Sequence, residues 1–142
     1  MKAIKIETTL THEFKPEDIN DLIVGALEGG INYWCRKAVI KLNGVTDSFL
    51  KSNVIGSFFG VAIEDQDKVV YASDAIGYGG TLILYDAESK EKWELTLENV
   101  LKAIEKHCTN RHIAPADLMD DYDADDCDCI VQYAIFGELM FC

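Results

Sequence analysis

Apolar residues recur at the spacing of an amphipathic helix in three parts of the chain. The first stripe follows Pro16, a residue suited to the first helical position because its missing N–H costs nothing there. The second follows Thr96, a typical capping residue, and the third begins near Asp123 and reaches Gly137. We therefore predict three helices. Their stripes are Ile19, Leu22, Ile23, Ala26 and Leu27, then Leu97, Val100, Leu101 and Ile104, then Cys127, Ile130, Val131, Ala134 and Ile135.

Branched and aromatic residues, which favour strands, are common between these stripes. Residues 2–10 alternate weakly and predict an edge strand, and residues 31–42 predict a longer strand. Residues 58–73 predict two strands around a polar turn. The clearest hairpin is "TLILYDAESKEKWELTL", residues 81–97, and "ELMF", residues 138–141, predicts a last short strand.

Glycines stand where the predicted elements end. We expect Gly29 or Gly30 to take the left-handed conformation that terminates the first helix. "SDAIGYGG", residues 73–80, predicts a single helical turn that is broken by its glycines.

The order of the predicted elements defines the fold class. One strand and one helix precede several hairpin-linked strands, and two helices follow. Hairpin connections favour an antiparallel or mixed sheet, with about three helices packed on one face. Residues 1–142 are a suitable length for a single core. We therefore predict one α+β domain.

Charge narrows the classes of partner. The chain has 25 acidic and 13 basic residues, so its formal net charge is −12. Such a chain repels nucleic acid and anionic membrane surfaces, and we expect it to bind neither directly. It can instead dock on a protein with a basic surface. The alternative is that the acidic residues serve solubility alone.

Two further features favour the cytosol. No apolar run reaches the roughly 18 residues of a membrane span, and "MKAIKIETTL" lacks the long apolar core of a signal peptide. The five cysteines are odd in number and unevenly spaced, which is unlike a secreted disulfide framework. We expect them to be reduced.

Seven aspartates lie in the segment "DLMDDYDADDCDC", residues 117–129. The segment fails as a calcium loop, because its sixth position is Asp126 and its twelfth is Gln132. The acids could complement the positive end of the third helix, form a partner-docking surface or hold a divalent cation. The docking candidates are Asp120, Asp121, Asp123, Asp125 and Asp126.

The spacing of the cysteines and histidines gives little support for a metal site or a catalytic nucleophile. His107, Cys108, His112, Cys127 and Cys129 are zinc-ligand types, but Cys-x-Cys replaces the usual Cys-x-x-Cys and Cys127 belongs to a buried stripe. No Gly-x-Ser-x-Gly motif occurs, and no local context pairs Cys35 with a base. We expect no catalytic residue, no cofactor and no metal.

Two short stretches are candidates for a flat ligand such as a nucleotide. Aromatic rings offer stacking faces, an amide can bind a base edge, and glycines allow close approach of the backbone. If residues 31–42 are a strand, Tyr33 faces away from its neighbours and only part of "NYW" is surface. Turn geometry is the alternative role of the glycines. The candidates are Asn32, Tyr33, Trp34, Arg36, Tyr78, Gly79 and Gly80.

Three stretches together carry a resemblance to a family: "ALEGGINYW", "ASDAIGYGGTL" and "DADDCDCIVQYAIFGE". They resemble a widespread group of small uncharacterised proteins encoded by bacteriophages and prophages. The likeness runs from residue 8 to residue 141 and is loose over residues 43–70. It implies a viral origin and expression in the bacterial cytosol, and it supplies no catalytic residues.

Three hypotheses about function follow. The first is a counter-defence inhibitor that docks an acidic surface on a host protein. The second is a sponge for a nucleotide signal, which would use the "NYW" and "GYGG" regions. The third is a small structural or assembly protein without a ligand.

Overall fold

The computed structural model describes residues 12–41 and 72–142, and within them three strands form one antiparallel sheet. The strands are β1 (Cys35–Lys41), β2 (Thr81–Asp86) and β3 (Lys92–Leu95), and β2 is central. Ala38 of β1 stands opposite Leu84 of β2, which stands opposite Trp93 of β3. The predicted hairpin is therefore confirmed.

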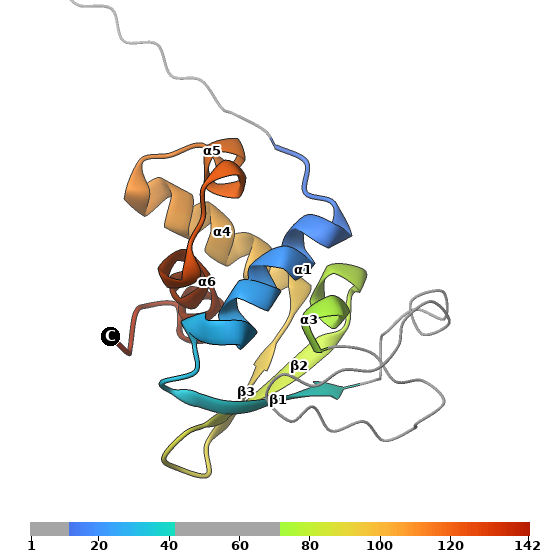
Figure 1. Cartoon of the computed structure of the whole chain (residues 1–142), viewed down its shortest axis with the longest axis vertical. Helices are drawn as coiled ribbons and strands as arrows, with labels where there is room; N and C mark the ends of the chain where they lie inside the picture. Colours follow the sequence, from blue (N-terminus) through green and yellow to red (C-terminus); the bar gives the residue numbers. More distant parts are fainter. Residues whose placement is uncertain (1–11, 42–71) are drawn as a thin grey trace, which may run out of the picture.

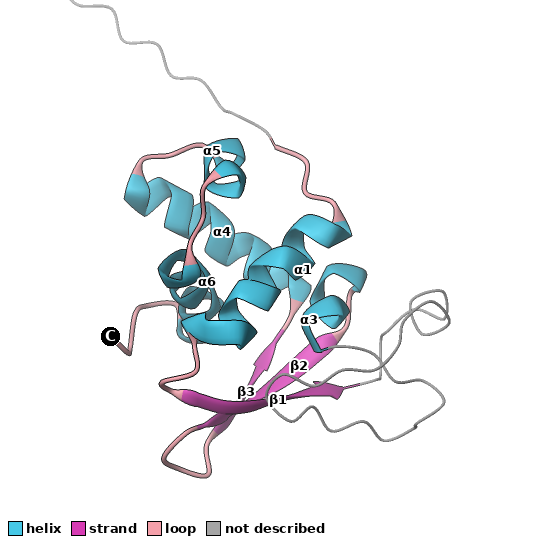
Figure 2. Ribbon diagram, in the orientation of Figure 1, coloured by secondary structure: helices cyan, strands magenta, loops and turns pink. Residues whose placement is uncertain are grey.

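The helices lie on one face of this sheet (Figures 1 and 2). This arrangement confirms an α+β domain. None of the helices in residues 12–41 and 72–142 is long and apolar enough to cross a bilayer. In chain order the helical elements are α1 (Pro16–Gly25), the π-helical turn η1 (Ala26–Gly30), α3 (Ala72–Ala75), the 3-10 turn η3 (Ile76–Tyr78), α4 (Leu97–Arg111), α5 (Pro115–Asp120) and α6 (Ala124–Phe136).

Local signals set the ends of the longer helices. The Thr96 hydroxyl accepts a hydrogen bond from the N–H of Asn99 (3.3 Å) at the start of α4. Asp123 caps α6, since its carboxylate accepts from the N–H of Asp126 (2.9 Å) and the carboxylate of Asp126 accepts in return (3.0 Å). Gly137 then ends α6 with φ of 74°. These termini are as predicted.

Alternate residues of the strands face the helices. Leu82 and Leu84 of β2 are fully buried, and their neighbours are only partly covered. Trp34, just before β1, is buried and stacks on Phe141 of the C-terminal tail with ring centroids 5.1 Å apart. It also meets Trp93 of β3 edge-on at 5.9 Å. This aromatic group joins the sheet, α6 and the tail.

Three predictions about elements need correction, and one helix was not predicted. Residues 31–34 are a turn, so the strand starts at Cys35 rather than residue 31. Residues 138–141 form no strand. Between the second and third predicted helices, the structure has a further short helix, α5, which the spacing of apolar residues did not predict. The predicted strands over residues 2–10 and 58–71 lie outside the described residues, and residues 72–73 belong to α3.

Gly29 and Gly30 do not have the predicted left-handed conformation, since the described glycines with positive φ are Gly79 and Gly137. The chain instead widens into η1, where the N–H of Ile31 bonds to the carbonyl of Ala26 (3.0 Å). A Cβ at Gly30 would lie 2.6 Å from the carbonyl oxygen of Ala124. Gly30 is therefore required for close contact between η1 and the start of α6, and this contact positions the turn that follows.

Candidate functional site

Two buried aspartates occupy opposite sides of α6. Asp126 and Asp128 are each no more than 7% exposed. Residues two apart on a helix are separated by about 200° around its axis. Asp126 consequently faces α4, whereas Asp128 faces the turn of residues 31–34.

The carboxylate of Asp128 collects three donors from neutral side chains. The hydroxyl of Tyr33 donates to Oδ2 (2.5 Å), and the indole N–H of Trp34 donates to Oδ1 (2.8 Å). The amide of Gln132, one turn further along α6, also donates to Oδ1 (2.9 Å). No cation among the described residues pairs with Asp128, so its negative charge is stabilised by dipoles alone.

Gln132 extends this network to the C-terminal tail. Its side chain is 1% exposed, and its carbonyl oxygen accepts from the backbone N–H groups of Met140 (2.7 Å) and Phe141 (2.8 Å). Its amide also donates to the carbonyl of Phe141 (3.2 Å). A single glutamine therefore bonds the tail in place, and this explains an ordered tail that does not form a strand.

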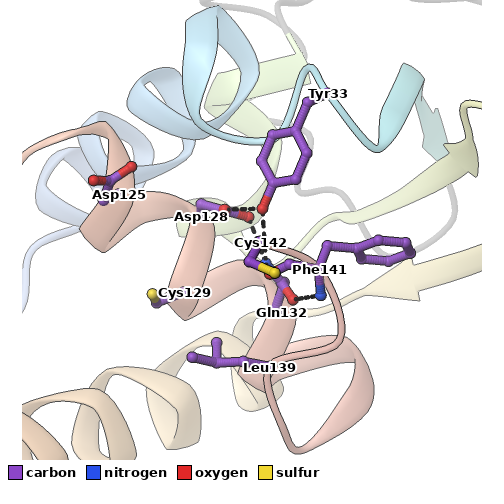
Figure 3. Close-up of a pocket in the computed structure, with 8 residues that line it drawn as sticks. All are labelled: Tyr33, Asp125, Asp128, Cys129, Gln132, Leu139, Phe141 and Cys142. Carbon is purple, nitrogen blue, oxygen red and sulfur yellow. Dashed lines mark hydrogen bonds between the residues drawn. The ribbon is translucent and has the colours of Figure 1, made fainter.

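A cavity of about 420 Å³ opens beside Asp128 (Figure 3). The ring of Tyr33 forms one wall, and Asp125 and Cys129 project from α6 on the other. Half of Tyr33 is exposed, but its hydroxyl points to the carboxylate of Asp128 on α6. Burial of that hydroxyl, together with the bond to Asp128, raises the pKa of Tyr33. The lining consists of Tyr33, Asp125, Asp128, Cys129, Gln132, Leu139, Phe141 and Cys142.

Asp126 has a different set of partners. His107 Nε2 lies 2.7 Å from its Oδ1, and Arg111 Nη1 donates to the same oxygen (2.6 Å). Burial alone would raise the pKa of Asp126, but the bonds from His107, the N–H of Asp123 and Arg111 outweigh it and lower that pKa. Asp126 thus joins α4 to α6. We remove it from the proposed docking surface, because it is buried and paired.

The other four docking candidates, Asp120, Asp121, Asp123 and Asp125, are exposed around the start of α6. A second cavity of about 390 Å³ includes Asp123 and Asp125 and shares Asp125, Cys129 and Leu139 with the first.

Helix α1 adds acidic residues that the sequence reading missed. Asp21 and Asp18 are near enough to Tyr122, in the loop before α6, to raise its pKa, although burial of the phenol is the larger cause. Asp21 also raises the pKa of Asp74 in α3, again after burial. Asp21 of α1 therefore lies near both Asp74 of α3 and the loop that precedes α6. The helical spacing around Pro16 shows that these acids lie off the apolar stripe, but it does not show which element they face.

The nucleotide candidates do not form one group. Residues 32–36 lie at the end of β1 that pairs with Asp86, whereas Gly80 precedes the other end of β2. Six residues of strand separate the two positions by about 20 Å. A single pocket within one chain cannot use both stretches.

The individual members of that group have local roles. Trp34 is core, Asn32 is exposed, and Arg36 donates to the carbonyl of Asp86 (3.2 Å) beside the ring of Tyr85. Gly79 has φ of 89°, as a turn requires. Among the candidates whose side chains the structure describes, Tyr33 alone lines the cavity beside Asp128.

Four of the cysteines are unfavourable nucleophiles. Burial raises the pKa of Cys35 to about 11 and that of Cys127 to about 12, so both are thiols at neutral pH. Burial also raises the pKa of Cys108 and Cys129. Within the described residues, no three histidine, cysteine or acidic side chains are placed to hold a metal ion.

Comparisons of the chain with protein-family models, with curated proteins and with solved structures found no match. The site must therefore be interpreted from its geometry. Residues 26–34 and 123–138, two of the three stretches singled out in the sequence, meet at Asp128. The third, residues 72–82, reaches the far end of β2.

Proposed function

We propose that this chain is a non-catalytic binding protein that docks the face around the start of α6 on a basic surface of a host protein. This docking face consists of Asp120, Asp121, Asp123, Asp125, Tyr33, Leu139 and Met140. The observation that carries the proposal is the convergence of exposed acids and exposed large apolar side chains at one place.

The apolar part of the docking face distinguishes it from a merely solvated acidic surface. Four large apolar side chains are exposed in the described residues. Two of them, Tyr33 and Leu139, line the cavity, and a third, Met140, follows Leu139 in the tail that Gln132 holds. Exposed apolar groups gathered in one patch are typical of protein interaction sites. Aromatic and apolar anchors supply most of the binding energy in such interfaces, and charged rims steer association.

The resemblance to bacteriophage proteins supports the choice of a bacterial host protein as the partner and the host cytosol as the compartment. A net charge of −12 favours a basic partner surface, including one that otherwise holds nucleic acid. An inhibitor that occupies such a surface is a counter-defence factor. The nucleotide-sponge alternative loses support, because its two stretches lie at opposite ends of β2.

The test begins with native mass spectrometry of the tagged protein recovered from host lysate at low salt. A partner found in this way is purified, and its affinity is measured for wild type and for the triple variant Asp120→Lys, Asp121→Lys, Asp125→Lys. Asp123 and Asp126 are left intact because together they cap α6, and a change at either would disturb the fold. We expect the triple variant to abolish binding, and we expect salt to weaken binding of the wild type.

The matched control is Glu88→Lys, Glu91→Lys, Glu105→Lys, which changes the net charge equally at three exposed positions on the β2–β3 hairpin and α4. We expect it to retain most of the affinity. If both triple variants lose binding equally, net charge alone acts and the proposed docking face is wrong.

A further inference from the structure

The cavity beside Asp128 is rich in hydrogen-bond acceptors and poor in donors. Among the described residues, its lining contains two side-chain carboxylates, Asp125 and Asp128, and one phenol, but no lysine, arginine or histidine. Asp125 is exposed, and no described group donates to it. A ligand that fits this lining must supply donors and positive charge.

The hydrogen-bond donors around Asp128 are also already used, which leaves acceptors for a ligand. Oδ1 accepts from both Trp34 and Gln132, whereas Oδ2 accepts only from Tyr33. The phenol proton of Tyr33 is committed to Asp128, so its hydroxyl oxygen can act only as an acceptor. The amide protons of Gln132 are directed to Asp128 (2.9 Å) and Phe141 (3.2 Å), and its contact with the Tyr33 hydroxyl is longer (3.4 Å). No strong donor is left for a ligand.

The walls of the cavity suit a flat cation with an apolar stem. The ring of Tyr33 is half exposed, and Leu139 and Phe141 add apolar surface. A guanidinium stacks on an aromatic face and is weakly hydrated, whereas an ammonium is compact and strongly hydrated. Several acceptors line the cavity, since Asp125 and Asp128 both project from α6 and the hydroxyl of Tyr33 meets Asp128 (Figure 3). The planar fork of a guanidinium directs its donors to two sides at once.

We propose that this cavity receives the guanidinium group of an arginine side chain presented by the basic partner. The inference rests on the proposed docking function and assigns its central contact. Ligand sites usually have volumes of about 300–1,000 Å³. The cavity, at about 420 Å³, is near the lower end of this range and is large enough for one arginine side chain. Three donors already hold the carboxylate of Asp128 in place, so little further conformational entropy is lost when the arginine binds.

The direct test is a titration of the full ¹⁵N-labelled chain with N-acetyl-arginine amide, followed by NMR. The indole N–H of Trp34 and the side-chain amide of Gln132 both bond to Asp128, so their resonances report on the cavity. We expect saturable shifts of both signals with the arginine derivative. We expect none with the citrulline derivative, which has the same shape without the charge. The lysine derivative should bind more weakly than arginine.

A pair of variants separates the cavity from the general acidic field. Asp125→Asn removes a carboxylate from the lining, and Asp121→Asn removes an exposed carboxylate outside it. We expect Asp125→Asn to weaken arginine binding about tenfold, as loss of a charge-assisted hydrogen bond does, and Asp121→Asn to change it less than twofold. Both positions are exposed, so neither variant should unfold.

The outcomes separate this inference from the docking function. Equal binding of arginine and citrulline, or equal effects of the two variants, would overturn the arginine cavity. If the cavity fails in this way while the triple aspartate reversal still abolishes partner binding, the docking function stands without it. If arginine binds as described but the matched triple variants do not differ, the docking function fails and the cavity remains.

Discussion

Asp126 and Asp128 stand two residues apart on one helix, and their surroundings differ in kind. Asp126 meets Arg111 and His107, so a cation opposes its charge. Asp128 meets a phenol, an indole and an amide, which orient its carboxylate but leave its charge uncompensated. The comparison teaches that burial of an acid does not decide its role. The partners decide it, and only the second acid is placed to attract a cationic ligand.

The largest expected effect comes from Asp126→Ala. This change leaves His107 buried without its partner and removes one half of the cap of α6. Breaking a buried ion pair costs about 3–5 kcal/mol, and we expect about 3 kcal/mol because Arg111 is half exposed. Urea denaturation measures the loss. The control is Asp125→Ala, which should change stability by less than about 0.5 kcal/mol. Equal losses would show that Asp126 does not hold the fold.

Asp128→Asn should have the next largest effect. The substitution replaces one acceptor oxygen with an NH₂ group that faces the donors of Trp34, Tyr33 or Gln132. One donor then lacks an acceptor, which costs about 1–3 kcal/mol. Urea denaturation followed by tryptophan fluorescence checks both stability and the indole environment. Tyr33→Phe, which removes only one bond, should cost less. An Asp128→Asn protein as stable as wild type would contradict the network.

Acid should act on the Asp126 cluster in a defined direction. The folded pKa of Asp126 lies below its unfolded value of about 3.9. The stability it contributes is therefore present above about pH 4 and lost as pH falls through the folded pKa. We expect the stability difference between wild type and Asp126→Ala to shrink when denaturation is repeated below pH 4. A difference that stays constant with pH would refute this linkage.

The smallest expected effect concerns Cys129, which lines both cavities. Burial, then the charges of Asp128 and its neighbours, including Asp125, raise the pKa of this thiol. We expect iodoacetamide at pH 8 to alkylate Cys129 more slowly than the exposed Cys142, as peptide mapping by mass spectrometry can measure. Asp125→Asn should raise the alkylation rate of Cys129 only about twofold, since exposed charges interact weakly. Equal rates at the two cysteines would contradict the expected shift.

Local signals carried most of the correct predictions about the fold. The cap at Thr96, the cap at Asp123 and the terminating glycine at Gly137 act on backbone groups within a few residues, so they can be read directly. The β2–β3 hairpin is likewise closed by its own turn. The exposed aspartates of the candidate site also follow from the sequence, because charged side chains at a helix start are usually solvated.

The wrong predictions share a cause, which is contact between distant segments. Gly30 is predicted to terminate a helix, but a glycine is needed there because the carbonyl oxygen of Ala124 leaves no room for a Cβ atom. The "ELMF" segment is predicted to be a short strand, but the backbone N–H groups of Met140 and Phe141 bond to the side chain of Gln132 instead of to another strand. The "NYW" and "GYGG" stretches suggest one ligand site, yet the register of β1 on β2 keeps them apart. No pattern within a short window contains these partners.

The sequence by itself determined the start of α4, both ends of α6, the hairpin and the excess of acid, because capping, periodicity and charge depend on residues close together in the chain. Tertiary structure alone decided that Asp126 and Asp128 are buried, which of the two has a cation beside it and where the cavity opens. Asp128 meets Tyr33 and Trp34 across 95 and 94 residues of chain. Burial and pairing arise only when such segments are brought into contact by the common core.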